Sequence, residues 1–229
     1  MKELESKKFI FQENREGQLQ FIGDFDGLYA SDSDPWSQSA NGIKGYDYRK
    51  YYNFSRTRLG KEIKNIESKK DLLEVGCGTG FVLKFLADSL PSLSLNGIDI
   101  SPIAIQRARV NFPEYNFSVG DIQSPELVAE QYYDIVIFSH VLWYILENLN
   151  TAVLNAHKLL RSGGHLIINQ AFFKEEQHYG NEILDGFSGC QQFMELHHNS
   201  LFSLISSNLD KSSDLKFNDG ILIYKRRIL

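Results

Sequence analysis

Residues 71–90 carry the feature that most limits what this chain can fold into. A short apolar run, Asp71 to Val75, predicts a buried strand, and apolar residues at helical spacing from Phe81 to Leu90 predict a helix soon after it. Three glycines join the two with the spacing G-x-G-x-G: Gly76, Gly78 and Gly80. Glycines allow tight turns and close approach of a ligand to the backbone, and a helix N-terminus offers unpaired N–H groups. The segment therefore predicts a strand–turn–helix unit that binds a ligand.

The rest of the chain repeats this alternation of strand and helix. Strands are predicted over residues 71–75, 93–99, 115–119, 133–139, 165–171 and 221–226. Helices are predicted over residues 80–90, 102–111 and 148–161, with a short helical segment near 125–131. Apolar strands that alternate with amphipathic helices predict an α/β fold with a mostly parallel sheet covered on both faces.

The 229 residues are expected to form a single domain. Its N-terminal part, residues 1–66, is predicted to hold a hairpin, an irregular loop over residues 23–45 and a helix from Tyr46 to Ile66. Its core, residues 71–229, is predicted to carry an irregular insert at about residues 172–209. We expect substrate contacts in this insert and in the N-terminal part, because binding residues concentrate on connections carried by a rigid sheet.

Composition and charge exclude several classes of protein. The net charge is −5 without a basic stripe, which argues against a nucleic-acid partner. Two cysteines do not make a disulfide framework or a zinc site, and the pair His197-His198 has no acid or cysteine at ligand spacing, so no metal is expected. No apolar run approaches the ~18 residues of a membrane span. The charged residues 1–8 lack the apolar core of a secretory signal, which predicts a cytoplasmic location.

Acidic residues follow the predicted strands at positions that suit a nucleoside. Asp99 lies 23 residues after Gly76, the distance at which a carboxylate accepts hydrogen bonds from ribose hydroxyls. Asp121 follows the third strand, where it suits an adenine amine, while Ile122 packs on the ring. The alternatives are a helix-capping acid for Asp99 and a turn acid for Asp121. Glu74, directly before a turn without the G-x-G-x-x-G spacing, disfavours a dinucleotide and favours a cofactor with an amine and a sulfonium.

Five ordered segments resemble the motifs of class I S-adenosylmethionine-dependent methyltransferases: residues 74–80, 97–101, 120–122, 133–142 and 159–168. The resemblance implies a Rossmann-like seven-stranded sheet with an antiparallel last strand and the N-terminal hairpin and helix as a lid. It implies that the glycines approach the methionine moiety, that Glu74 organises their turn, and that Ser139 presents backbone near the sulfonium. The predicted cofactor site comprises Trp36, Tyr46, Arg49, Glu74, Gly76, Cys77, Gly78, Gly80, Asp99, Ile100, Asp121, Ile122 and Ser139.

The N-terminal part resembles small-molecule methyltransferases related to the nodulation enzyme that N-methylates chitooligosaccharides. Asp34-Pro35-Trp36 and the later run from Tyr46 to Tyr51 carry this resemblance. Trp36 and Tyr46 are expected to cover the cofactor, and Arg49 to bind its carboxylate or an anionic substrate through two hydrogen bonds. The alternative is that the aromatic residues pack the helix on the sheet and Arg49 is solvated.

His140 is the first candidate for a catalytic base. It directly follows the fourth strand, and its ordinary pKa near 6.5 suits proton acceptance at neutral pH. The alternative is a structural hydrogen bond to a neighbouring loop. Tyr144, Trp143 and His178 are further candidates for shaping the acceptor site, and His165 is expected to be structural.

The sequence thus predicts an enzyme that transfers a methyl group from S-adenosylmethionine to an oxygen or nitrogen atom of a small molecule. A sugar or surface-glycan precursor is the first expectation, and a natural-product precursor is the second. A non-catalytic S-adenosylmethionine-binding protein is the alternative from another class. The protein is expected to be a monomer or a homodimer. The Pro-Pro-aromatic motif of methyltransferases that act on nucleic-acid bases does not follow the fourth strand.

Overall fold

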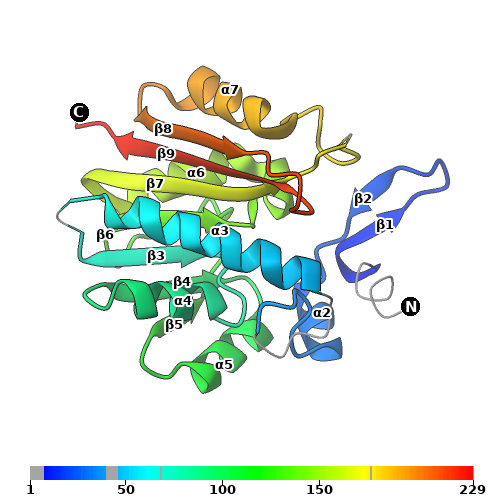
Figure 1. Cartoon of the computed structure of the whole chain (residues 1–229), viewed down its shortest axis with the longest axis horizontal. Coiled ribbons are helices and arrows are strands. Elements are labelled where there is room, and N and C mark those ends of the chain that lie inside the picture. The colour runs from blue at the N-terminus through cyan, green and yellow to red at the C-terminus, as the bar shows by residue number, and fades with distance from the viewer. Residues whose placement is uncertain (1–7, 40–45, 68, 176, 229) are drawn as a thin grey trace.

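A seven-stranded mixed sheet forms the centre of the computed structural model (Figure 1). The structure describes residues 8–39, 46–67, 69–175 and 177–228, and only the backbone of residues 46 and 47. The strands are β3 (Asp71–Val75), β4 (Ser94–Asp99), β5 (Asn116–Val119), β6 (Tyr133–Ser139), β7 (Leu160–Phe172), β8 (Phe202–Asp210) and β9 (Asn218–Arg226). They lie side by side in the order β5-β4-β3-β6-β7-β9-β8.

Strand direction follows the prediction. The pairs β3–β4, β4–β5, β3–β6 and β6–β7 are parallel. Strand β9 runs antiparallel to both of its neighbours, β7 and β8. The Rossmann-like sheet with an antiparallel last strand is therefore confirmed. The order reverses between β3 and β6, and ligands of open α/β sheets bind at such a point, outside the carboxyl ends of the strands.

Helices cover both faces of the sheet. One face packs against α3 (Tyr46–Lys64), α4 (Phe81–Ser89) and α5 (Pro102–Asn111), and the other against α6 (Leu149–Leu159) and α7 (Gly186–His198). Successive residues of a strand point to opposite faces, so the apolar strands supply both cores. Leu72 and Ile135 lie in the cluster with α3, α4 and α5, whereas Leu73 and Val136 lie in the cluster with α6 and α7.

The N-terminal part contains one helix that the sequence analysis did not predict. The hairpin consists of β1 (Phe11–Glu13) and β2 (Leu19–Phe21). Helix α2 (Phe25–Ser31) then occupies part of the predicted irregular loop over residues 23–45. The Asp24 side chain caps it by accepting from the N–H of Gly27 at 2.8 Å. The Oγ of Ser101, at the start of α5, donates to Asp26 at 2.5 Å and ties α2 to the sheet domain.

Three other predictions of secondary structure were wrong or incomplete. Residues 125–131 form turns rather than a helix, and the Asn155 amide of α6 holds the start of this segment by donating to the carbonyls of Ile122 and Ser124 at 2.8 and 2.7 Å. The insert at 172–209 contains α7 and β8, because α7 buries Cys190 and Met194 against the sheet and β8 pairs along β9. Helix α6 ends at Leu159, and β7 begins directly after it.

Among the described residues, we find no helix that combines the length and the apolar character needed to cross a membrane.

Candidate active site

The glycine turn after β3 is held in place by Asp99, the last residue of β4. One carboxylate oxygen of Asp99 accepts from the N–H of Gly78 at 2.8 Å, and the other accepts from the N–H of Ser101 at 2.9 Å. Burial raises the pKa of Asp99, while the N–H groups of Ser101 and Gly78 oppose that rise. Each carboxylate oxygen retains a second lone pair, so Asp99 can still accept from the hydroxyls of a ligand.

Helix α2 lies directly on this turn. Gly78 has a φ of +52°, and a Cβ at this position would lie 2.6 Å from the hydroxyl of Tyr29. The same hydroxyl accepts from Nε1 of Trp36 at 3.1 Å. The half-buried Trp36 therefore reaches the glycine turn through Tyr29, a contact that the sequence analysis missed.

Five buried polar atoms at this edge of the sheet have no hydrogen-bond partner among the described residues. They are Ser37 Oγ, Arg56 Nε, Glu74 Oε2, Ser139 Oγ and His140 Nδ1. Buried polar atoms normally have partners, so a group of five without them points to a missing ligand. A carboxylate oxygen suits an ammonium group, and a guanidinium N–H suits a carboxylate. This donor set fits an amino acid linked to a nucleoside.

Arg56 of α3 is the buried cation that faces Glu74. Burial raises the pKa of Glu74 well above its ordinary value, and the positive charge of Arg56 opposes that rise. The guanidinium donates to the backbone oxygen and to Oε1 of Gln38 at 3.3 and 3.2 Å, and it lies over the ring of Tyr52 at 5.6 Å. Arg49, the arginine predicted for the cofactor carboxylate, is exposed two turns earlier on the same helix. The side chain of Tyr46 lies outside the described residues.

His140 adopts a left-handed conformation with a φ of +57°, which is uncommon for a residue other than glycine. Its backbone N–H donates to the carbonyl of Asn169 at 2.9 Å. The ring contacts the rings of Tyr51 and Tyr52, at 5.7 and 5.4 Å between centroids, and Nε2 lies 3.2 Å from Oγ of Ser55. Burial, together with the positive charge of Arg56, lowers the pKa of His140 to about 3. The imidazole is therefore neutral at physiological pH, and in the absence of a ligand it is a weaker base than the sequence analysis assumed.

Tyr144 lies at the centre of an aromatic cluster that joins the N-terminal hairpin and α2 to the sheet domain. Its ring centroid lies within 6.4 Å of four other rings, those of Phe11, Phe21, Phe25 and Trp36. Burial raises the pKa of the Tyr144 hydroxyl, which therefore stays protonated. Of these residues only Trp36 and Tyr144 were predicted, because the three phenylalanines carry no motif.

The residues predicted for the adenine side lie at the ends of β4 and β5. Asp121 is half-buried and accepts from the N–H of Gln123 at 2.8 Å, and Ile122 is buried in the core. Ile100 is 46% exposed, as expected for an apolar side chain that covers a ligand ring. Cys77 packs instead against Gly97, since a Cβ at Gly97 would lie 2.7 Å from its sulfur, so only its backbone lies at the turn.

Trp143 and His178, the further candidates for shaping the acceptor site, differ in their surroundings. Nε1 of Trp143 donates to the carbonyl of Ala171 at 3.1 Å, which fixes the indole to β7. His178 is exposed. Over the part of the chain that the structure describes, no group of His, Cys, Asp or Glu side chains is arranged to hold a metal ion.

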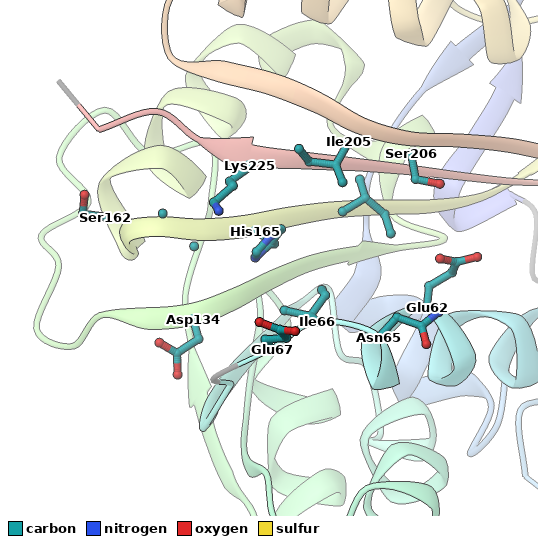
Figure 2. Close-up of a pocket in the computed structure, with 13 residues that line it drawn as sticks. Glu62, Asn65, Ile66, Glu67, Asp134, Ser162, His165, Ile205, Ser206 and Lys225 are labelled. Atoms are coloured by element: carbon teal, nitrogen blue, oxygen red, sulfur yellow. The ribbon is translucent and has the colours of Figure 1, made fainter.

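A hollow of about 510 Å³ lies away from this edge, near the amino end of β6 (Figure 2). Asp134, His165 and Lys225 line it together with Glu62 from the last turn of α3 and Asn65, which follows that helix. Burial and the neighbouring charge of Lys225 lower the pKa of His165. The hollow contains none of the predicted site residues, and we do not assign the cofactor to it.

Comparisons with known proteins find methyltransferases. Residues 73–166 match a family model described as a methyltransferase domain. The chain is 39% identical over 102 residues to a malonyl-[acyl-carrier protein] O-methyltransferase of Acetivibrio thermocellus, over 44% of this chain and 35% of that protein. It is 32% identical over 114 residues to nodulation protein S of Rhizobium tropici, over 48% of this chain and 46% of that protein. The chain thus spans less than half the length of these curated relatives.

Solved structures share the fold at low sequence identity. The N-methyltransferase NodS from Bradyrhizobium japonicum, in complex with S-adenosylhomocysteine, superposes with a TM-score of 0.61 at 20% identity, over 86% of this chain and 93% of that chain. Magnesium protoporphyrin IX methyltransferase from Synechocystis, with bound S-adenosylmethionine, superposes with a TM-score of 0.65 at 18% identity, over 88% and 95%.

Proposed function

We propose that this chain is a class I S-adenosylmethionine-dependent methyltransferase and that it transfers a methyl group to an oxygen or nitrogen atom of a small molecule. The family and its cofactor agree with the prediction from the sequence. The group of unpartnered buried polar atoms beside the glycine turn carries the proposal, because its charges complement the amino-acid end of S-adenosylmethionine.

Each part of the cofactor has a residue suited to hold it. Glu74 would bind the ammonium group and Arg56, in place of the predicted Arg49, the carboxylate. Asp99 would accept from the ribose hydroxyls, and Asp121 from the adenine amine. The carboxylates of Glu74 and Asp99 also disfavour the pyrophosphate of a dinucleotide.

Methyl transfer depends more on the relative position of the two reactants than on proton transfer. When bound, S-adenosylmethionine supplies a methyl group that its positive sulfur already activates for in-line displacement. Good orientation of two reactants can contribute about 7–11 kcal/mol, and a base about 10²–10⁴-fold. His140 and Tyr144 lie after β6 on the acceptor side of the turn. A neutral His140 would take the proton of the acceptor, and the aromatic cluster around Tyr144 would exclude water.

A sugar or surface-glycan precursor is our first candidate for the acceptor. The likeness to nodulation protein S over 48% of the chain and the likeness to the NodS fold support this choice. The second candidate is a natural-product precursor, which is favoured by 35% identity over 135 residues to part of a hybrid synthetase, thnA, of Trichoderma harzianum. A cytoplasmic location and a monomeric or homodimeric state stay predictions.

An assay for S-adenosylhomocysteine tests the proposal. The protein is incubated with S-adenosylmethionine and separate pools of oligosaccharides, nucleotide sugars and small carboxylic or phenolic compounds. We expect one pool to give multiple turnovers that His140→Gln strongly reduces. Tight binding of S-adenosylmethionine without turnover in any pool would favour a non-catalytic binding protein, and binding of NAD instead would contradict the proposed cofactor.

A further inference from the structure

We propose that Ser55, Asn169 and Asp219 are positioning residues that hold the proton of neutral His140 on Nε2 and leave Nδ1 bare for the acceptor. This inference rests on the proposed function for its role in methyl transfer. The arrangement of protons itself follows from a buried chain of hydrogen bonds that connects His140 to three different elements of the fold.

The chain of hydrogen bonds begins at a fully buried carboxylate. Asp219, in β9, pairs with the guanidinium of Arg58 and accepts from the hydroxyl of Tyr51 at 2.9 Å. Both partners come from α3, so the carboxylate is held between the helix and the sheet. A carboxylate accepts hydrogen bonds and does not donate them. The side chain next to Asp219 must therefore point an N–H or O–H group at the carboxylate.

That neighbour is Asn169 in β7, which is also fully buried. Its amide nitrogen lies 3.5 Å from Oδ1 of Asp219, a long contact whose direction is set by charge. An amide oxygen in that place would face the carboxylate and repel it. The amide nitrogen is therefore the atom turned toward Asp219. The hydroxyl of Ser55 lies 3.1 Å from that nitrogen and donates to the oxygen of Asn169 at 3.2 Å.

The direction in which Ser55 donates determines the direction of its hydrogen bond with His140. Ser55 donates its proton to the oxygen of Asn169 or to the carboxylate of Asp219. In either case Oγ of Ser55 acts as an acceptor toward Nε2 of His140 at 3.2 Å. Nε2 must then carry the proton, and Nδ1 is left with a free lone pair. Nδ1 is buried and has no partner among the described residues, as this arrangement requires.

The opposite arrangement leaves more buried groups unsatisfied. In it, Asn169 donates to Ser55 across 3.1 Å and Ser55 donates to Nε2 of His140. The Asn169 oxygen would then lose the only donor described for it, and Nδ1–H of His140 would be a buried donor without an acceptor. Each such group loses its hydrogen bonds to water without gaining a partner, which destabilises the fold. The first arrangement leaves only one lone pair, so it is favoured.

This arrangement suits a proton acceptor. As the acceptor atom bonds to the methyl carbon and the carbon–sulfur bond breaks, the proton of the acceptor atom moves to the lone pair of Nδ1. Nε2–H keeps its hydrogen bond to Ser55 throughout, so the ring does not need to turn. The imidazolium carries the positive charge that the sulfonium loses in the same step, and the net charge of the pocket is unchanged.

Nuclear magnetic resonance of the protein labelled with ¹⁵N-histidine tests the arrangement without reference to activity. Two-bond ¹⁵N–¹H spectra distinguish the two neutral tautomers and the imidazolium, and His140→Gln identifies the signal. We expect the Nε2–H tautomer of His140 at neutral pH. The Nδ1–H tautomer or an imidazolium would overturn the proposal. This result stands even if no acceptor is found, so it separates the inference from the proposed function.

The variant Ser55→Ala tests the positioning role. We expect mixed tautomers of His140, a kcat lowered about 10-fold with unchanged affinity for S-adenosylhomocysteine, and partial recovery in Ser55→Thr. The matched control is Thr57→Val on the same helix, where an exposed hydroxyl donates only to the backbone oxygen of Asn53, at 2.7 Å. Unchanged tautomers in Ser55→Ala, or an equal effect of Thr57→Val on kcat, would refute the role of Ser55.

Discussion

The two ends of the central strands differ in whether their acidic side chains have partners. At the amino end, Asp134 accepts from the N–H groups of Lys70 and Asp71 at 2.8 and 3.0 Å. Arg161 pairs with both Asp71 and Asp134, at 2.8 and 3.0 Å. At the carboxyl end, Glu74 is buried, and its Oε2 has no partner among the described residues.

The pKa values follow the same division. Burial acts to raise the pKa of Asp134, but the N–H groups of Asp71 and Lys70, together with Arg161, lower it. Burial instead dominates the pKa of Glu74 and raises it well above its ordinary value. At the amino end, charged side chains thus join neighbouring strands, whereas the carboxyl end buries ionisable groups that we propose bind a ligand. Such groups reduce the stability of the free protein, and we interpret them as features of a functional site.

The largest expected effect compares the carboxylates of the two ends. Asp99→Ala removes the proposed acceptor for the ribose and the tether of the glycine turn. Charged hydrogen bonds contribute about 1.5–3 kcal/mol each. We expect the affinity for S-adenosylhomocysteine, measured by titration calorimetry, to fall at least about 100-fold. The control Asp134→Ala should lower the free energy of unfolding but preserve this affinity. Equal losses of affinity in both variants would remove the distinction between the two ends.

A smaller effect is expected for the arginines. Arg56→Gln should weaken binding of S-adenosylhomocysteine about 10-fold, because one charge-assisted contact to the carboxylate is lost. Arg161→Gln should leave binding unchanged, since its ion pairs lie at the other end and its side chain is 42% exposed. Arg49→Gln provides a second control on α3. If Arg49→Gln weakened binding more than Arg56→Gln, the original prediction for Arg49 would be restored.

The smallest effect concerns pH. The pKa of His140 is lowered to about 3 by burial and by Arg56, and Tyr51 and Tyr52 of α3 are the other titratable groups against its ring. The unfolded chain binds a proton at His140 below about pH 6.5, while the folded chain does not. His140 thus stabilises the fold above pH 6.5, and this contribution falls by at most about 1.4 kcal/mol for each pH unit below it.

Urea unfolding at pH 7 and pH 5.5 measures this contribution. Between pH 7 and pH 5.5, the free energy of unfolding should fall more in the wild-type protein than in His140→Gln. Both proteins contain Glu74 and Asp99, so the difference between the two losses reports the contribution of His140 alone. The raised pKa values of Glu74 and Asp99 act in the opposite direction, because a carboxyl that is harder to ionise when folded loses stability as the pH rises. An identical loss in both proteins would show that His140 is accessible to protons in the folded state.

Local sequence was sufficient for six of the seven strands of the sheet and for the glycine turn. Strand β3, the three glycines and α4 are adjacent in the chain, and each is specified by a short pattern that works over its own length. The Ser101-Pro102 start of α5 is equally local, and Oγ of Ser101 accepts from the N–H of Ala104 at 3.2 Å. Helix α7 and strand β8 were missed because their patterns are weak and their stability comes from packing on β9 and the core.

Such local patterns did not predict contacts between side chains that are far apart in the sequence. Asn169 and Asp219 contact Ser55 or Tyr51 of α3 only because the sheet brings β7 and β9 under that helix. Both residues are polar interruptions of apolar strands, and that is the signal that could have marked them. The contact of Tyr29 with the glycine turn depends on how α2 docks.

The sequence by itself predicted a Rossmann-like methyltransferase fold, the strands that bear the motifs and the glycine turn proposed for the cofactor. It predicted the amphipathic helix α3 but not which of its arginines lies at the site. Arg49 and Arg56 are seven residues apart, so they lie on the same face and about 10 Å apart along the helix. Only the tertiary structure, by placing α3 across the end of β3, decided that Arg56 is buried beside Glu74 and Arg49 is exposed.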